Sequence, residues 1–589
     1  MDSSSSLIRF LAGVRQFSAM APGQLTRLYG FTALKVLAKG EAGALAGEAV
    51  DELHIIVSGR LAEHGRGPHA QEFGQGAALA AEAFFARRPA SATLIALRET
   101  LLLTLSWDDV TAAFRAHPEL LEACFAALSG TGATVPPPPS PPNRLVLCAA
   151  GAKGRLDAAV KNAFVSALEG SADIRILRRE SFGSLALDAP ETAHWLQEQE
   201  LEFEATVVVA DGADASFAKD AIEEGDDLVF IASSGSPALS SLEQHALDRR
   251  GKDRCRLIIA KDEGISLKNA ADWIAPRSYR STQLVDFASP KEAALMAATL
   301  LGKGIAVAAT SCGVYAASIL GALQAFEANG APPSCLAAAG SAILPAGLLA
   351  SGASLAETEA TFRELAEPLP WKRAAKPDAG LFEAAAIDAM LALALPECNI
   401  GLTARPFVAL SLSLSENAPR LHREGRFHNA VRAGLTPPGV LPPFISDGND
   451  ILVSGENEVE ALVAAAVNLS ASPVVFLYPS VPGLGSSGMS YRQLAGPSFR
   501  LAPFQGPSTP EKRLRMETVL GAVSSKTSPT FPAAASQGFA IPMPAGVSPM
   551  DWQEWGRLRD AAFEWTSAEL VTRGLAQRED SEAFQGASS

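Results

Sequence analysis

The sequence predicts a multidomain protein that begins with a small β-roll and continues as α/β regions. Its 589 residues are enough for roughly three or four domains of about 150 residues each. A proline-rich run, TVPPPPSPP at residues 134–142, cannot form a helix or a central strand and therefore separates two folding units. Strand patterns dominate before this run, whereas strands and helices alternate after it.

Short strands with turn residues between them define the first domain, residues 1–133. A helical stretch is predicted from Trp107 to about Leu128. The proline-rich linker, residues 134–143, closes this unit, which we interpret as a β-roll with a C-terminal helix. The strand candidates are residues 53–61, 92–97 and 101–106.

An intermediate Rossmann-like α/β domain is predicted over residues 144–300. Apolar strand patterns alternate there with helical segments such as residues 155–169, which favours a parallel, doubly wound sheet. The turn at residues 149–155 is glycine-bearing, but its spacing differs from G-x-x-x-x-G-K-[S/T], so we favour a plain strand–helix turn over a nucleotide site. The strand candidates are residues 145–148, 205–210, 227–232 and 256–260.

A second α/β unit with a helical C-terminal extension is predicted over residues 301–589. Residues 335–344 have the pattern of a strand–turn–helix elbow, and residues 508–575 are expected to be mostly helical with Pro/Ser-rich interruptions. The glycine pattern at residues 483–488 matches G-x-G-x-x-G by letters, but no clear helix follows it, so we favour a loop. The other elements are strands at 304–309, 406–412 and 473–478 and a helix at 315–328.

Charge and composition exclude several classes of function. The net charge of −15, without a long Lys/Arg run, argues against nucleic-acid binding. The six cysteines form no C-x-x-C pair and the eight histidines show no metal spacing, so we expect a reducing compartment, no metal and no cofactor. His422 and His428 are interpreted as surface histidines. The first residues lack the pattern of an export signal, so we expect a cytoplasmic protein.

The first domain carries KGE at residues 39–41, a strand ending in SGR at 58–60, and FGQG at 73–76. In this order the motifs resemble the cyclic-nucleotide-binding domain family. The resemblance implies a phosphate cassette in which a short helix offers N–H groups and an arginine after a proline pairs with the cyclic phosphate. The corresponding positions here are Ala81, Glu82, Arg88 and Ala90.

The residues at these positions lack the side chains that would bind the cyclic phosphate and the ribose. Ala90 stands where the arginine should be, and the carboxylate for the ribose is replaced by Ala81 or, with a slip of one residue, becomes Glu82. We therefore favour a structural or partner-facing β-roll. The alternative is a ligand sensor that holds a nucleotide through Arg87 or Arg88.

The rest of the chain carries landmarks of a known hydrolase family: GIAV at 304–307, GALQAFEANG at 321–330, AGLLASG at 346–352, and the segment 429–444. Nearly the whole chain thus resembles the patatin-like phospholipases, specifically their neuropathy-target-esterase branch. The resemblance implies a patatin-like α/β hydrolase domain with a Ser-Asp dyad and a glycine-rich oxyanion loop.

The nucleophile motif G-x-S-x-G falls on residues 338–342, so the nucleophile position carries Gly340. A shift of one residue would make Ser341 the nucleophile, but would put the β-branched Ile343 in a crowded position. We interpret Ser341 as a helix-start residue whose hydroxyl caps backbone N–H groups.

The other two catalytic elements are also replaced. The family's oxyanion loop keeps only Gly313, and Tyr315 stands where a basic residue belongs. The position of the general base carries Ser454, which cannot take a proton from another serine at neutral pH. Asp447 and Asp450 lie nearby in a segment typical of an exposed turn. The vestigial loop consists of Thr310, Ser311, Cys312, Gly313 and Tyr315.

These losses together predict a pseudoenzyme: a catalytically inactive patatin-like protein that serves as a binding, scaffold or regulatory subunit in lipid metabolism. Candidate partners, by analogy, are an active patatin-like homologue or another protein, and a fatty acyl lipid. We also expect an oligomer and consider peripheral membrane contact. The alternative is a serine esterase or lysophospholipase that uses Ser341 with a non-standard base such as Asp447 or Asp450.

Overall fold

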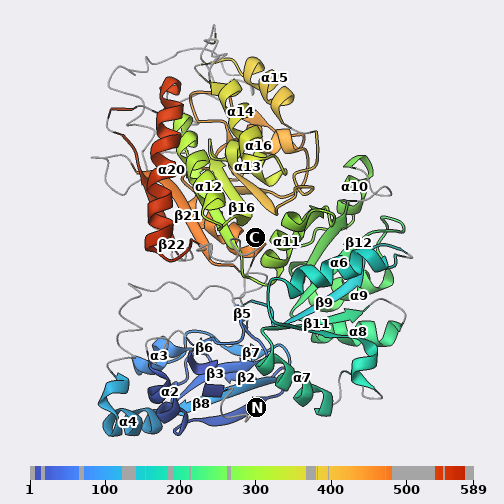
Figure 1. Ribbon diagram of the computed structural model, residues 1–589, viewed down its shortest axis with the longest axis vertical. Helices are drawn as coiled ribbons and strands as arrows, with labels where there is room; N and C mark the ends of the chain where they lie inside the picture. The colour runs from blue at the N-terminus through green and yellow to red at the C-terminus, as the bar shows by residue number, and fades with distance from the viewer. Residues whose placement is uncertain are drawn as a thin grey trace, which may run out of the picture. The chain divides into compact units, whose positions relative to one another are not determined.

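The computed structural model forms two compact units (Figure 1). Unit 1 is Met1–Gly264 with Pro276–Arg280 and Leu300–Gly302; unit 2 is Ile265–Ala275, Ser281–Thr299 and Lys303–Ser589. The structure describes residues 7–8, 10–12, 14, 17, 20–64, 72–121, 141–152, 154–183, 187, 190–210, 214–261, 267–366, 374, 380, 382–395, 397–470, 472–480, 537–544, 546–547, 549 and 551–576.

Two four-stranded antiparallel sheets form the β-roll at the start of unit 1, drawn in blue in Figure 1. Apolar side chains of the central strands, such as Leu53, Ile55 and Leu103, are fully buried between the sheets and their helices. The predicted β-roll is thus confirmed. In spatial order the strands are β1 (Ala33–Leu37), β8 (Thr100–Ser106), β3 (Glu52–Ser58) and β6 (Ala78–Leu79), and β2 (Ala42–Ala44), β7 (Leu94–Ala96), β4 (Leu61–Glu63) and β5 (Glu72–Phe73).

The helices of the β-roll are α2 (Pro22–Tyr29), α3 (Ala81–Phe85) and α4 (Trp107–Ala116). Helix α4 begins where the Ser106 hydroxyl accepts a hydrogen bond from the Asp109 N–H at 3.1 Å. It ends earlier than the predicted helix, because Pro118 disfavours helical backbone at His117. Residues 122–140, which include most of the predicted linker, lie outside the described residues.

A parallel sheet with helices follows in unit 1, as the alternating pattern predicts. Every residue of four of its strands is buried, as expected when helices cover both faces of a parallel sheet. In spatial order the strands are β10 (Ile174–Leu177), β11 (Ala205–Ala210), β9 (Arg144–Ala149), β12 (Asp227–Ala232) and β13 (Cys255–Ala260). The helices are α6 (Ala158–Glu169), α7 (Pro190–Glu202), α8 (Ala215–Glu224) and α9 (Ser241–Arg250).

Unit 2 contains a larger sheet whose core is parallel. Its parallel strands lie in the order β17 (Phe407–Ser413), β16 (Pro333–Gly340), β15 (Ile305–Ser311), β21 (Val474–Ser480) and β22 (Gln537–Pro542). Next to β17 lie β18 (Ala418–His422) and β20 (Ile451–Ser454), both antiparallel to it, and β19 (Phe444–Ile445) pairs with β20. The predicted strands and the elbow after β16 are therefore confirmed as elements of one α/β unit.

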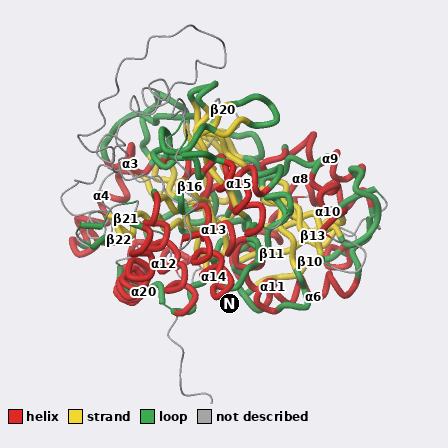
Figure 2. The backbone as a smooth tube through the Cα atoms, turned by 90° about the horizontal axis from the view of Figure 1, so that it is seen from above, coloured by secondary structure: helices red, strands yellow, loops and turns green. Residues whose placement is uncertain are grey.

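Helices cover both faces of this sheet. One face packs against α12 (Ala316–Ala328), α13 (Ile343–Ala350), α14 (Leu355–Ala366), α16 (Phe427–Gly434) and α20 (Trp555–Thr572), and the other against α17 (Val459–Leu469). Figure 2 shows α12, α13, α14 and α20 on one side of β16, β21 and β22. Helix α12 approaches α20 so closely at Gly321 that a Cβ on this residue would collide with the Arg559 carbonyl oxygen.

The segment before α20 differs from its prediction. The sequence predicts mostly helix over residues 508–575, but residues 537–542 form strand β22, parallel to β21. Local sequence misleads here, because Gly538 and Pro542 weaken a strand signal that pairing with β21 supplies instead. Residues 481–536, including the glycine pattern at 483–488, lie outside the described residues.

The remaining elements of unit 2 are α10 (Leu267–Ile274), β14 (Ser281–Val285), α11 (Pro290–Leu300) and α15 (Ala385–Ala394). Strand β14 is tied to this unit by the Leu284 N–H, which donates to the Thr403 carbonyl oxygen at 3.1 Å. Among the helices that the structure describes, none is long and apolar enough to cross a membrane.

Candidate functional site

Gly340 occupies the sharp turn between β16 and α13, where the hydrolase resemblance puts a nucleophile. Its φ of +64° lies in the left-handed region that favours glycine. A Cβ at this position would collide with the Ser311 carbonyl oxygen and would lie 3.1 Å from Glu456 Oε2. The elbow therefore has the backbone of a nucleophile turn, but the space for a side chain is already filled.

Ser341, the alternative nucleophile, hydrogen-bonds to a neighbouring serine. Its hydroxyl lies 2.9 Å from the Ser311 hydroxyl, and its N–H donates to the Ser311 carbonyl oxygen at 2.9 Å. Helix α13 has Ala342 as its N-cap, without a side-chain cap. Our interpretation of Ser341 as a helix-capping residue is therefore wrong: the parallel pairing of β15 and β16 brings Ser311 within reach of its hydroxyl.

In the loop after β15, one backbone donor and one side-chain hydroxyl bond to another segment of the chain. Cys312 is followed by a short 3-10 helix, Gly313–Tyr315. The Val314 N–H donates to the Pro549 carbonyl oxygen at 2.8 Å, and the Tyr315 hydroxyl donates to the Val547 carbonyl oxygen at 2.8 Å. An oxyanion loop must aim such N–H groups at the substrate. Here the Val314 N–H is bonded to the Pro549 carbonyl oxygen instead.

The segment after β20 brings a carboxylate to the elbow. Ser454 is the last residue of β20, and its hydroxyl donates to Glu456 Oε2 at 3.5 Å. Thr310 fixes the backbone there, since its hydroxyl donates to the Glu456 carbonyl oxygen at 3.0 Å. Burial raises the pKa of Glu456 to about 7, against the smaller lowering by Ser454. The same burial, with the Glu456 charge, raises the pKa of Cys312, which keeps that thiol unreactive.

Sequence reasoning gave Glu456 no role, although it is the carboxylate that faces Gly340. The signal was present: SGE stands where the family has D-G-G or D-G-A, so an acidic group lies two residues beyond its usual place. The whole side chain lies close to the elbow, since a Cβ placed on Gly340 would be 3.2 Å from Glu456 Cβ as well as 3.1 Å from Oε2.

The other proposed bases have different surroundings. Asp450 Oδ1 accepts a hydrogen bond from the Ser413 hydroxyl at 2.6 Å. It precedes Ser454 by four residues, about 13 Å at the rise of an extended strand. Asp447 is exposed in a turn in which the Asn449 N–H donates to the Ser446 carbonyl oxygen at 2.9 Å. The structure therefore does not bring either aspartate to the elbow.

A serine–histidine pair lies beside the site on β17 and β18. The Ser411 hydroxyl is 2.7 Å from His422 Nε2, and Ser411 faces Ser454 across the sheet. Burial, together with the charge of Arg420, lowers the pKa of His422 to about 4, so its ring is neutral at pH 7. His422 is thus not the plain surface histidine we predicted. Ser411 is fully buried, so the pair stabilises the sheet rather than meeting a substrate.

The cassette of the β-roll lacks a phosphate-facing arginine among its described residues. Ala90 is buried, and its N–H donates to the Glu48 carbonyl oxygen at 2.9 Å. Arg88 is exposed, whereas Arg87 pairs with Asp51 at 3.3 Å and stacks 4.7 Å from the centre of the Trp107 ring. Ala81 begins α3; the side chain of Glu82 lies outside what the structure describes.

The glycine-bearing turn after β9 binds the carboxylate of Glu243 from the same chain. The Gly151 N–H donates to Glu243 Oε2 at 2.8 Å, and the Ser240 N–H donates to the same oxygen at 2.8 Å. Arg277 Nε lies 2.5 Å from Glu243 Oε1, and the Tyr279 hydroxyl donates to that oxygen at 3.2 Å. Glu243 and Arg277 are buried. The plain-turn interpretation is therefore favoured, since a carboxylate fills the place a phosphate would need.

The two sheets and the cassette geometry define the class of the first domain. Residues 34–117 match the family described as "Cyclic nucleotide-binding domain". The predicted domain type is thus confirmed for the β-roll. The N-terminal domain of a transcriptional regulator from Streptomyces coelicolor A3(2) is similar over 20% of this chain and 88% of its own, with 25% identity and a TM-score of 0.19.

The longer similarity is to two curated relatives. The chain is 22% identical over 483 residues to "Patatin-like phospholipase domain-containing protein 6" of Pongo abelii, a match that covers 71% of this chain and 35% of that protein. The protein of the same name from Homo sapiens is 22% identical over 484 residues, with the same coverage. The chain thus matches about a third of the length of these relatives, and the similarity supports the predicted patatin-like phospholipase resemblance.

Proposed function

We propose that this chain is a catalytically inactive patatin-like protein that acts as a binding or scaffold subunit. The observation that carries the proposal is Gly340: the elbow of the nucleophile is present, yet its residue has no oxygen, and the Ser311 carbonyl oxygen blocks a side chain there. A serine hydrolase needs a nucleophile, a base and donors for the oxyanion. The first is missing, and the Val314 and Ser341 donors bond to other groups of the protein.

The proposed partners follow from what the scaffold keeps. The α/β core of unit 2 is intact around the elbow, so the surface that an active patatin-like relative presents is a reasonable place for pairing or for an acyl chain. We propose an active patatin-like homologue or a fatty acyl lipid as the partner, in the cytoplasm or at a membrane surface, with the chain as part of an oligomer.

The competing function is a serine esterase that uses Ser341. Two observations favour it: Ser341 is partly exposed, and Glu456, with a pKa of about 7, lies at the same elbow. Against it, the Ser341 N–H and hydroxyl are both held by Ser311. The candidate bases named from the sequence, Asp447 and Asp450, lie away from the elbow.

The deciding experiment is labelling of the purified full chain with a fluorophosphonate probe, which reacts only with activated serines. Wild type and Ser341→Ala are compared, with Ser351→Ala as a control because its hydroxyl donates to the Leu348 carbonyl oxygen outside the elbow. We expect no labelling of any of them. Labelling that disappears only in Ser341→Ala, together with turnover of a lysophospholipid, would establish the esterase instead.

A further inference from the structure

Two arginines of the β-roll stand at the tips of adjacent hairpins. Arg60 follows the turn between β3 and β4, and Arg98 lies in the turn between β7 and β8. The turns are held together because the Arg60 N–H donates to the Thr100 hydroxyl at 3.2 Å. Gly59, with a φ of +105°, allows this approach, since a Cβ there would collide with Thr100. The β-roll therefore presents both guanidinium groups from one fixed edge.

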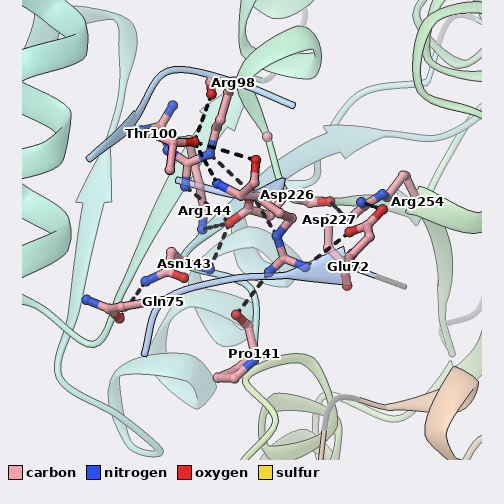
Figure 3. Close-up of polar contacts among 12 residues, drawn as sticks. Glu72, Gln75, Arg98, Thr100, Pro141, Asn143, Arg144, Asp226, Asp227 and Arg254 are labelled. Atoms are coloured by element: carbon pink, nitrogen blue, oxygen red, sulfur yellow. Dashed lines mark hydrogen bonds and ion pairs between the residues drawn. The ribbon is translucent and has the colours of Figure 1, made fainter. Parts of the chain in front are cut away.

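Two carboxylates of the α/β region receive these arginines. Arg98 Nε lies 3.2 Å from Asp226 Oδ1, and Arg98 Nη1 lies 3.1 Å from Glu200 Oε1. Arg60 Nε lies 3.5 Å from Asp226 Oδ1. Glu200 comes from the end of α7 and Asp226 directly precedes β12, and both are 1% exposed. Figure 3 shows Arg98 and Asp226 facing one another.

Further groups satisfy the remaining oxygens of both carboxylates. Glu200 also accepts from Arg144 Nη2 at 2.6 Å and from the Ser58 hydroxyl at 2.5 Å. Asp226 Oδ2 accepts from the Arg144 N–H at 3.1 Å. Figure 3 shows Arg144 converging on the same place as Arg98. A buried charge is tolerated only when it is paired and hydrogen-bonded in this way.

The arginines lower the pKa values of both carboxylates. Burial alone would raise the pKa of Asp226 and of Glu200, but the neighbouring arginines, led by Arg98, hold both pKa values below their usual range. Both carboxylates therefore carry their charge at neutral pH. Two positive groups on one region thus meet two negative groups on the other in a water-excluded setting.

We infer that this arginine edge of the β-roll is a docking surface for the α/β region of the same chain, so that these two parts of unit 1 unfold as one cooperative unit. Its arginines bind carboxylates of this chain at Glu200 and Asp226. This inference is independent of the proposed function, because it concerns unit 1 alone.

The test is hydrogen exchange measured by mass spectrometry on the full chain, comparing wild type with Arg98→Met. We expect exchange to rise at least roughly tenfold both in the β-roll hairpins and in peptides over α7 and β12, because removing one partner leaves buried charges uncompensated. The control is Arg87→Met, whose guanidinium is about half-exposed and pairs with Asp51 of the β-roll itself. It should leave α7 and β12 unchanged.

A double variant separates docking from simple damage to the β-roll. Arg98→Met with Asp226→Asn removes one charge of each sign and keeps the Arg144–Glu200 pair. We expect it to lose less stability than the sum of the two single variants. If either single variant fails to fold, Gln197→Ala, which removes the 2.9 Å contact with Glu99, gives a milder opening of the same surface. Faster exchange confined to the β-roll, or strictly additive losses, would overturn the inference.

Discussion

The backbone N–H of Val314 donates a hydrogen bond to the carbonyl oxygen of Pro549 at 2.8 Å. Val314 lies in the loop that an active patatin-like enzyme would use to stabilise an oxyanion, and Pro549 comes from the segment before α20. A donor already paired within the protein cannot also lower the barrier to ester cleavage. A serine introduced at Gly340 should therefore not by itself give the chain esterase activity.

The first prediction concerns Gly340→Ser. We expect the variant to gain no fluorophosphonate labelling and to lose stability, because its Cβ meets the Ser311 carbonyl oxygen. Comparison with Gly425→Ala isolates the steric part, since Gly425 has a φ of +96° and open space for 4 Å around the position a Cβ would take. Gly425→Ala should cost about 1 kcal/mol and Gly340→Ala clearly more, measured by denaturant unfolding. Equal losses would mean that the elbow has room for a side chain.

A second prediction concerns the pH dependence due to Glu456. Its folded pKa of about 7 exceeds the value of 4.5 for a free Glu, so the folded protein binds a proton that the unfolded chain releases between these pH values. This group therefore makes stability fall as pH rises from about 4.5 to about 7. Glu456→Gln should be more stable than wild type at pH 8, by up to about 3 kcal/mol, with the difference shrinking near pH 5.

The control for that measurement is Glu460→Gln, because Glu460 lies four residues further on, exposed in the first turn of α17. Its replacement should leave the pH profile of wild type in place. Unfolding curves are recorded from pH 5 to pH 8. A parallel pH profile for wild type and Glu456→Gln would show that the Glu456 carboxyl is solvated rather than buried at the elbow.

A third prediction concerns the carboxylates of the docking surface, whose pKa values are shifted in the opposite direction to that of Glu456. The pKa values of Glu200 and Asp226 lie below their usual range, so their contribution is present above the unfolded pKa and is lost as pH falls through the folded pKa. Exchange protection in α7 and β12 should therefore stay constant from pH 8 to pH 5, after correction for intrinsic rates. Loss of protection within that range would contradict the ion pairs.

The internal anion Glu243 gives a fourth prediction. Glu243→Ala should destabilise the chain by about 3–5 kcal/mol, because it leaves Arg277 buried without its carboxylate. Sodium formate or phosphate should raise the melting temperature of this variant more than that of wild type. The matched control is Glu357→Ala, since Glu357 accepts from the Ser354 N–H at 2.8 Å in an exposed setting and should show no such rescue.

The β-roll gives a fifth prediction. Millimolar cyclic AMP or cyclic GMP should not shift the melting temperature of the full chain, because Ala90 offers no charge and Arg87 is engaged with Asp51 and Trp107. A reproducible upward shift that disappears in Arg88→Ala would instead support the ligand-sensor alternative.

Sequence reasoning predicted the central strands of both α/β regions because these are continuous apolar runs between turn residues, as in residues 227–232, but it missed β10, β14 and β22. It placed Gly340 at the nucleophile position through the patatin-like resemblance, whose G-x-S-x-G motif falls on residues 338–342. It gave Glu456 no role, although the SGE run at residues 454–456 puts an acidic group there. It could not find the contact of Ser411 with His422 or of Val314 with Pro549, because no local pattern encodes which partner a side chain or N–H group will meet.

The pairing of β22 with β21, and of α20 with α12, sets an order of events during synthesis. Residues 474–480 and 316–328 leave the ribosome long before residues 537–572 exist, yet the latter cover them in the finished unit. Until translation has passed α20, β21 is an open sheet edge and α12 has an uncovered apolar face, the features that promote misassembly. Nascent chains of this protein should therefore need protection by a chaperone late in synthesis.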